Sequence, residues 1–340
     1  MKKLLNTLYV STQGIYLNRE GETVVASLDR EPRLRLPIHT LSGIVCFGNV
    51  MCSPFLLGLC GERGVKVSFL TEFGRFLARV EGPVSGNVLL RREQMRRADD
   101  PVATLPLAKN FVIGKILNSR TVLQRALRDH GEKPVLSSAV TSLADCLRRV
   151  RQAEDINILR GYEGEAANIY FDAFDHLIVA QQGAFSMQTR SRRPPLDPLN
   201  ALLSFLYTIL AHDCRGALEG VGLDPQVGFL HALRPGRPSL ALDLMEEFRP
   251  ILADRVALSL INLKQINAQG FTTSESGAVV MTDETRKTVL TAWQEKKKET
   301  LQQPFLNQKT DVGLLPHIQS LLLARHLRGD LDAYPPFLLK

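Results

Sequence analysis

The spacing of apolar residues along the chain changes at one place, and this change constrains the fold most strongly. In the first part, residues 33–38 alternate polar and apolar side chains, which is the period of a half-buried strand. Residues 18–21 have the composition of a hairpin turn, and the β-branched run 23–26 follows them. Only residues 54–60 favour a short helix here. This pattern predicts a small domain built from strands.

The apolar spacing becomes helical after a short segment rich in glycine and proline. Residues 83–87 contain Pro, Gly and Asn, which interrupt regular structure and indicate a linker. Beyond it, apolar residues recur every three or four positions, as on the buried face of a helix. We therefore expect a two-domain α+β protein, with a β domain at 1–82, the linker at 83–87 and a larger all-α domain at 88–340. Helices are predicted at 105–127, 136–150, 153–179, 199–218, 242–266, 283–301 and 314–327.

The chain is basic and lacks the marks of a secreted or membrane protein. Among its 340 residues, Lys and Arg number 42 and Asp and Glu 35, which gives a formal net charge of +7. This excess favours a polyanionic partner, although many proteins share it. Five cysteines without a C-x-x-C pair suit a reducing compartment. The longest apolar run, 202–211, is shorter than the roughly 20 residues of a membrane helix. We expect a cytoplasmic protein without membrane contact.

The chain has no P-loop, H-E-x-x-H or G-x-S-x-G motif, so these kinds of site are excluded. The remaining candidate site residues are acidic and imidazole side chains. In the segment 159–167, Gly161 and Gly164 each cost a helix about 1 kcal/mol relative to alanine. They suggest that something approaches the backbone closely around Glu163. Glu163 and Glu165 are two positions apart, so only one of them can face a given site. The alternative is a Glu163 side chain that is simply solvated.

Two further segments carry an imidazole and paired carboxylates. His231 ends the short apolar run 228–231 and precedes a Gly/Pro loop, from which a side chain can project into a cleft. Asp243 shares a helix face with Glu246 or with Glu247, and spacing alone leaves both pairs open. Each segment also has a structural interpretation, as a core histidine or as acids that complement a helix dipole.

Carboxylates together with one imidazole suit a divalent ion such as Mg²⁺ or Mn²⁺. Such an ion can activate a hydroxyl nucleophile and stabilise charge on a phosphoryl oxygen. Guanidinium groups cluster near these segments in the sequence, and such clusters neutralise nucleic-acid phosphates whatever the base sequence. The candidates for phosphate contacts are Arg190, Arg192, Arg193, Arg234 and Arg237.

Several motifs occur together in the order typical of one known family. They are G-K-I-L-N-S-R at 114–120, R-G-Y-E-G at 160–164, R-R-P-P-L-D-P-L-N at 192–200, G-F-L-H at 228–231 and D-L-M-E-E-F-R-P at 243–250. Over essentially its whole length the sequence resembles the CRISPR-associated spacer integrases, the universal adaptation endonucleases, and most of all their subtype I-C form.

This resemblance implies a catalytic helical domain and a β domain for dimerisation and partner contact. It also implies a homodimer that clamps a small ferredoxin-fold CRISPR-associated partner and acts on double-stranded DNA, with a processing nuclease as a further partner left open. The family's metal ligands correspond to Glu163, His231 and Glu246, and Asp243 corresponds to a residue that supports the site. The preference for Glu246 over Glu247 therefore rests on the resemblance.

We therefore expect a Mn²⁺- or Mg²⁺-dependent integrase that joins the 3′-hydroxyl ends of short duplex DNA, the new spacers, into a CRISPR repeat by phosphodiester transesterification. With water in place of the hydroxyl, the same site becomes an endonuclease. Two alternatives stay open at this point. One is a junction-resolving or non-specific metal-dependent nuclease, and the other is a non-catalytic scaffold that bridges DNA.

Overall fold

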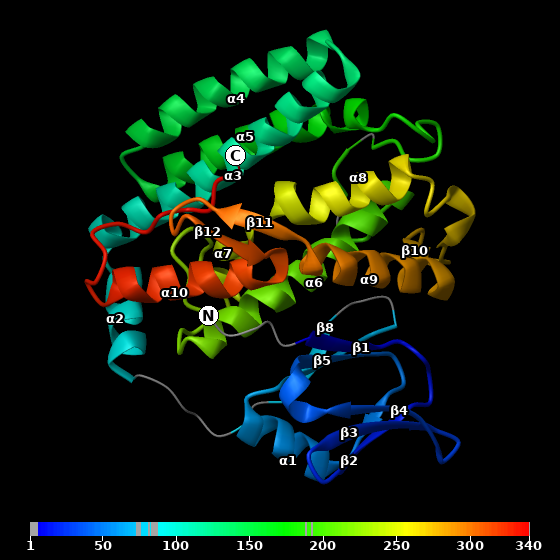
Figure 1. Ribbon diagram of the computed structural model, residues 1–340. Helices are drawn as coiled ribbons and strands as arrows, with labels where there is room; N and C mark the ends of the chain where they lie inside the picture. Colours follow the sequence, from blue (N-terminus) through cyan, green and yellow to red (C-terminus); the bar gives the residue numbers. More distant parts are fainter. Residues whose placement is uncertain are drawn as a thin grey trace. The chain divides into compact units, whose positions relative to one another are not determined.

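The computed structural model describes residues 6–72, 76–80, 82, 88–187, 189–191 and 193–339. The chain divides into two compact units, Met1–Gly86 and Asn87–Lys340, drawn in Figure 1 in blue and in cyan to red. The expected linker at 83–87 lies outside the described residues. Among the described helices, none combines the length and the apolar character needed to cross a bilayer.

The described residues of the first unit form two four-stranded sheets and one α-helix. One sheet has the order β1-β5-β7-β8, in which only the β7–β8 pair is antiparallel. The other has the order β4-β3-β2-β6, in which only the β2–β6 pair is parallel. The elements are β1 (Asn6–Val10), β2 (Tyr16–Glu20), β3 (Thr23–Leu28), β4 (Glu31–Pro37), β5 (Leu41–Phe47), β6 (Met51–Cys52), α1 (Pro54–Arg63), β7 (Lys66–Leu70) and β8 (Phe76–Val80), with a 3₁₀ turn at Ile38–Thr40.

The core of this unit lies where strand residues and the inner face of α1 meet, with Leu17, Ile44 and Leu56 fully buried. α1 begins where expected because the Ser53 hydroxyl accepts a hydrogen bond from the Leu56 N–H and Pro54 occupies the first turn. The expected hairpin exists between β2 and β3, with its turn at residues 21–22.

The second unit is mainly helical, and two short hairpins accompany its helices. The chain thus has a β-strand domain followed by a helix-rich domain, which confirms the predicted fold class. The helices are α2 (Val88–Asp99), α3 (Pro101–His130), α4 (Pro134–Gln152), α5 (Ile156–Asp172), α6 (Pro198–Gly220), α7 (Ser239–Met245), α8 (Arg255–Asn262), α9 (Asp283–Lys298) and α10 (Leu315–Leu327), with 3₁₀ turns at Phe174–Leu177, Ala268–Gly270 and Val312–Leu314. The hairpins join β9 (Phe271–Thr273) to β10 (Val279–Met281) and β11 (Thr300–Gln303) to β12 (Gln308–Asp311).

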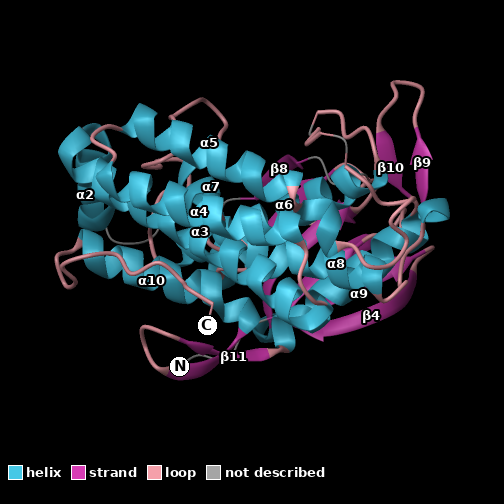
Figure 2. Cartoon of the chain, turned by 90° about the horizontal axis from the view of Figure 1, so that it is seen from above, coloured by secondary structure: helices cyan, strands magenta, loops and turns pink. Residues whose placement is uncertain are grey.

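Helices α3, α4 and α5 run alongside one another and contact each other, as Figure 2 shows, while α6 packs on α7 and α10. Aspartates set the start of three of these helices, one of them α6, where the Asp197 carboxylate accepts from the Asn200 N–H. The Asp100 carboxylate accepts from the Val102 N–H at the start of α3, and the Asp155 carboxylate accepts from the N–H groups of Asn157 and Ile158 at the start of α5.

The helix predicted over 242–266 is interrupted. α7 ends at Met245, a π-helical segment, η3, spans Arg249–Asp254, and α8 begins only at Arg255. Pro250 lacks a backbone N–H and so removes one hydrogen bond of a regular α-helix at this point. The charged residues Glu246, Glu247 and Arg249 lie in the interruption, in keeping with the frequent occurrence of π-helical turns at functional sites.

Candidate metal centre

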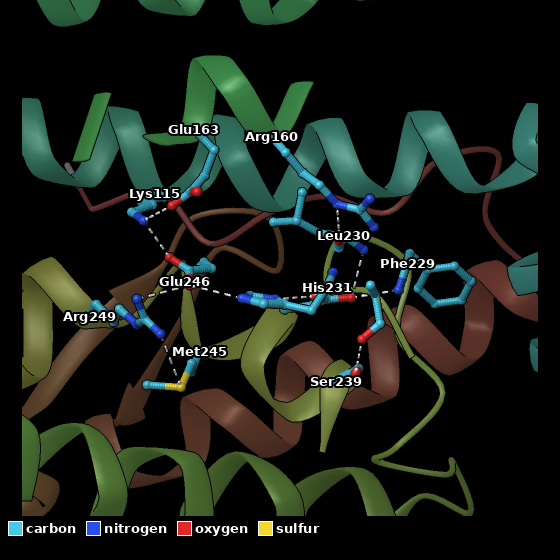
Figure 3. A network of polar contacts seen from close by, with 12 residues as sticks. Lys115, Arg160, Glu163, Phe229, Leu230, His231, Ser239, Met245, Glu246 and Arg249 are labelled. Carbon is cyan, nitrogen blue, oxygen red and sulfur yellow. Dashed lines mark hydrogen bonds and ion pairs between the residues drawn. The ribbon is translucent and has the colours of Figure 1, made fainter. Parts of the chain in front are cut away.

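Three segments of the second unit bring acidic and imidazole side chains together around one lysine. Glu163 comes from α5, Glu246 directly follows α7, and His231 lies in the irregular segment before α7. Lys115, from the middle of α3, makes ion pairs with both carboxylates, and Figure 3 shows its ammonium group between them. Residues distant in the sequence thus meet at one point.

Glu246 is buried and ionised. Its Oε2 lies 2.8 Å from the Lys115 Nζ, and its Oε1 lies 3.1 Å from the Arg249 Nη1. Burial raises the pKa of Glu246, but the charges of Arg249 and Lys115 outweigh burial and hold the pKa below its ordinary value. Burial likewise lowers the pKa of Lys115, but Glu246 and Glu163 outweigh it and raise the pKa above its ordinary value. The ion pairs therefore keep both partners charged.

Asp243 fixes the orientation of His231. Its fully buried carboxylate accepts hydrogen bonds from the N–H groups of Phe229 (2.6 Å), Leu230 (2.9 Å) and His231 (2.9 Å). The His231 Nδ1 lies 2.7 Å from the Asp243 Oδ1, so this nitrogen carries a proton and donates it to the carboxylate. The other ring nitrogen, Nε2, is left with its lone pair, 4.0 Å from the Glu246 Oε1. This tautomer is the one that can ligate a metal.

Glu247 faces away from this site. Its buried carboxylate accepts from the Tyr334 hydroxyl (2.6 Å), the Phe337 N–H (2.7 Å) and the Gln319 amide (3.2 Å). Burial raises its pKa to about 8, against the opposing effect of these three hydrogen bonds. Of the two glutamates that helical spacing left open, Glu246 is therefore the one beside Lys115 and Glu163, and Glu247 secures the segment that includes Tyr334 and Phe337.

Sequence reasoning assigned no role to three cations of the site. The family motifs contain all three, Lys115, Arg160 and Arg249, and this position within the motifs is the feature that could have marked them as site residues. Arg160 stands one turn before Glu163, and its Nε donates to the Leu230 carbonyl at 2.7 Å. It thereby ties α5 to the segment that carries His231.

The predicted phosphate-contacting arginines differ in exposure. Arg190 is turned into the fold, where it donates to the Asn200 amide oxygen and stacks over the rings of Phe171 and Tyr207. Arg192 lies outside the described residues.

Arg193 and Arg234 are exposed, and Arg237 is half-buried. Burial lowers the pKa of Arg237, and the charges of Arg234, Arg160 and Arg193 lower it further, while Asp243 opposes them. These four guanidinium groups therefore share one electrostatic region beside the site.

Open space adjoins the same residues. A cavity of about 320 Å³ is lined by Arg160, His231 and Phe229, among others. Beyond the backbone of α5 and the adjoining residues, no described atom lies within 4 Å of a Cβ built at Gly161 or Gly164. The close approach that the two glycines suggested is therefore not made by the described part of the chain.

The donor set fits a divalent cation. Two carboxylates and a neutral imidazole nitrogen are ligands that Mn²⁺ and Mg²⁺ accept. The Glu246 Oε2 is buried without a hydrogen bond, since its contact with Lys115 lacks hydrogen-bond geometry. As the side chains stand, no three His, Cys, Asp or Glu residues of the described chain are arranged to hold a metal. The Lys115 ammonium stands between Glu163 and Glu246.

Comparison with known proteins identifies the class to which this fold and site belong. A family model described as CRISPR associated protein Cas1 matches residues 8–295. The chain therefore belongs to the Cas1 family of CRISPR-associated proteins, as its motifs predicted. The subtype I-C assignment stays a prediction.

One relative and two solved structures illustrate the similarity. The chain is 58% identical over 340 residues to the CRISPR-associated endonuclease Cas1 1 of Chlorobaculum tepidum, with 99% of each protein covered. The prediction that the chain is an enzyme of an endonuclease family is thereby confirmed. A casposase bound to integration product shares the fold with a TM-score of 0.84 at 22% identity, covering 98% of this chain and 94% of that one. A chain of a Cas6–RT–Cas1–Cas2 complex does so with a TM-score of 0.83 at 22% identity, covering 98% of this chain and 36% of that one.

Proposed function

We propose that this protein is a divalent-metal-dependent DNA integrase, which joins the 3′-hydroxyl ends of short duplex DNA into a CRISPR repeat. The observation that carries the proposal is the convergence of Glu163 and Glu246 on one cation-binding point, with the free Nε2 of His231 beside Glu246. Helical spacing within a single segment cannot produce this arrangement, because the three residues come from separate elements. A structural role for the acids does not require an imidazole oriented in this way.

Glu163, His231 and Glu246 would hold the ion, and the family resemblance favours the same three residues. A bound Mn²⁺ or Mg²⁺ supplies a Lewis acid that polarises a phosphoryl oxygen and favours ionisation of a hydroxyl group. Asp243 keeps the proton of His231 on Nδ1 and thus Nε2 available. Arg160 holds the His231 segment against α5.

In the reaction, the 3′-oxygen of the incoming strand forms a bond to a repeat phosphorus, and the bond from that phosphorus to its own strand's 3′-oxygen breaks. The attacking hydroxyl loses its proton and the departing oxygen gains one. When water replaces the 3′-hydroxyl, the same exchange is hydrolysis. Endonuclease activity therefore needs no further machinery.

We assign contacts with DNA phosphates to the region of Arg193, Arg234 and Arg237. Their shared electrostatic region and the 320 Å³ cavity beside His231 support this assignment. Arg190 supports this region from within the fold, and the role of Arg192 stays a prediction.

The proposal extends to partners. The similar casposase is bound to integration product, and the similar Cas6–RT–Cas1–Cas2 complex includes Cas2. These similarities support double-stranded DNA, both protospacer and repeat, as substrate and a small ferredoxin-fold protein as partner. The first unit, at 1–82, would form the homodimer and contact this partner, and 88–340 would carry catalysis. A processing nuclease is a further proposed partner.

A strand-transfer assay tests this function. The purified chain and its small partner are mixed with a labelled short duplex and a supercoiled plasmid that carries the repeat, in Mn²⁺ or in EDTA. We expect labelled DNA joined to the plasmid only with metal, and none with Glu163→Gln. Glu165→Gln is the matched control, because Glu165 lies two residues further on the same helix and pairs with Arg149 instead. Wild-type joining by Glu163→Gln would contradict the assignment.

A second candidate function is a metal-dependent nuclease that cuts DNA without joining it. The partial exposure of Glu163 (26%) and His231 (20%) admits water to the site, which favours hydrolysis. Nicked plasmid without joined label, in every combination of partner and metal, would favour this candidate. Membership of a family with endonuclease relatives argues against the scaffold alternative.

A further inference from the structure

Lys115 occupies the point on which the acidic side chains converge. Its side chain leaves α3 and is 9% exposed, and its Nζ contacts both the Glu163 Oε1 and, at 2.8 Å, the Glu246 Oε2. Figure 3 shows the ammonium between these two carboxylates, with Arg249 on the other side of Glu246. A cation is therefore present at this point as part of the chain.

We propose that Lys115 is an internal counter-ion of the metal site, which a divalent cation must displace in order to bind. This inference rests on the proposed metal-dependent function. It makes Lys115 a positioning residue that holds the two carboxylates together before the metal arrives and weakens the apparent metal affinity by competition.

Charge accounts for the first part of this role. Among the described residues, Arg249 pairs with the Glu246 Oε1, whereas Lys115 pairs with both Glu246 and Glu163 and so joins the two carboxylates. Without it, two carboxylates would face each other beside a largely buried space. Like charges at short range repel more strongly where water is excluded.

Distance accounts for the second part. A Mg²⁺ ion takes its oxygen ligands at about 2.0–2.1 Å and demands near-octahedral geometry. The ammonium at 2.8 Å from the Glu246 Oε2 and in contact with Glu163 fills the space between those oxygens. Ion and ammonium therefore exclude each other, and the long flexible lysine stem permits the ammonium to leave. If the paired state outweighs the open state by ten to one, the apparent metal affinity falls by about the same factor.

Metal binding, measured without DNA or turnover, tests the inference. Free Mn²⁺ is followed by electron paramagnetic resonance during titration of the full chain, as wild type, Lys115→Met and Lys115→Gln. Lys109→Met is the control, because Lys109 lies on the same helix and donates to the Arg151 carbonyl. We expect at least tenfold tighter Mn²⁺ binding by Lys115→Met, a smaller gain by Lys115→Gln and no change in Lys109→Met. In EDTA, Lys115→Met should have a lower Tm than wild type. Addition of Mn²⁺ should raise the Tm of Lys115→Met by more than it raises the Tm of wild type.

The outcomes separate this inference from the proposed function. If wild type and Lys115→Met both bind no Mn²⁺, the metal site itself is wrong. If wild type binds Mn²⁺ and the folded Lys115 variants bind it equally or more weakly, only the role of Lys115 is wrong.

A measurement on wild type alone covers the case in which the variants do not fold. Acetylation of lysines by acetic anhydride is read by peptide mass spectrometry in EDTA and in saturating Mg²⁺. Displacement should raise labelling of Lys115 several-fold, with Lys109 unchanged as the internal reference. Equal labelling of Lys115 in the two conditions, together with demonstrated Mg²⁺ binding, would refute displacement.

Discussion

Replacing Asp243 by asparagine changes one atom type at a fully buried position, and the structure allows its consequences to be worked out. The carboxylate accepts from three backbone N–H groups and from the Nδ1 of His231. An asparagine has one acceptor oxygen, so its best orientation keeps the contacts with Phe229 and Leu230. Its NH₂ group then faces the His231 N–H and Nδ1, which are donors in the wild type.

Two effects follow from this mismatch. The His231 N–H loses its acceptor, at about 1–3 kcal/mol for a buried unsatisfied group, and the two remaining bonds lose the strengthening of a charged acceptor at about 0.5–1.5 kcal/mol each. We expect the free energy of unfolding to fall by about 2–6 kcal/mol. Moreover, the NH₂ group favours the His231 tautomer with its proton on Nε2, which removes the nitrogen lone pair proposed as a ligand. Loss of such a supporting partner typically weakens metal binding about 10–100-fold.

Urea unfolding in EDTA and Mn²⁺ titration in its absence measure the two effects separately. Asp155→Asn is the matched control, because an asparagine caps a helix as well as an aspartate does, and it should change the unfolding free energy by less than about 0.5 kcal/mol. If Asp243→Asn unfolds at the wild-type urea concentration and binds Mn²⁺ with wild-type affinity, the argued role of Asp243 is refuted.

Three further predictions concern the surroundings of the site. A Cβ at Gly114 would lie 2.9 Å from the Glu247 Cγ, so Gly114→Ala should lower the free energy of unfolding by about 1–3 kcal/mol. Gly161→Ala, with open space around it, should instead raise the free energy of unfolding by up to about 1 kcal/mol, and thermal unfolding checks both. The folded-state pKa of Glu247, about 8, is above the unfolded value, so the stabilising effect of this carboxyl is present below the unfolded pKa and lost as pH rises through 8. Glutamine does not titrate, so the stability of Glu247→Gln relative to wild type should rise by up to about 1.4 kcal/mol per pH unit between pH 5 and 8. Urea unfolding in EDTA measures this. Arg237→Ala should lower the slope of log affinity for DNA against log salt concentration by about 1. Arg148→Ala should leave the slope unchanged, because Arg148 pairs with Asp145 at the surface. An unchanged slope for Arg237→Ala would show that Arg237 does not contact DNA phosphates.

The order of strands and helices could be predicted from sequence because their signals are local. Alternation at 33–38 and the β-branched run 23–26 correspond to β4 and β3, and the helical spacing at 199–218 corresponds to α6. The spacing in α6 records which side of the helix meets the core. In β4 the alternation marks a strand, but its residues are exposed or half-buried and not part of the core. Each pattern is complete within a few turns or residues. Motif order went further and indicated the family, which the comparisons confirmed.

Spacing alone predicted the site only as a set of residue types, and the family resemblance was needed to prefer Glu246. Spacing allowed Glu246 or Glu247 to accompany Asp243, and it gave no reason to include Lys115. It also favoured a continuous helix at 242–266, where the chain instead turns into η3. The hydrogen bonds of Tyr334 and Phe337 to Glu247 span 87 and 90 positions, and no local pattern contains such contacts.

By itself, the sequence determined the two-part fold class, the family and the side chains available for chemistry at the site. Tertiary structure alone decided that Glu246 faces Glu163, that Asp243 orients His231 and that an ammonium group lies between the carboxylates. The physical reason is that periodicity reflects burial, a property each element expresses along its own length. The position of a charge relative to another depends instead on how separate elements pack, and neither element encodes it alone.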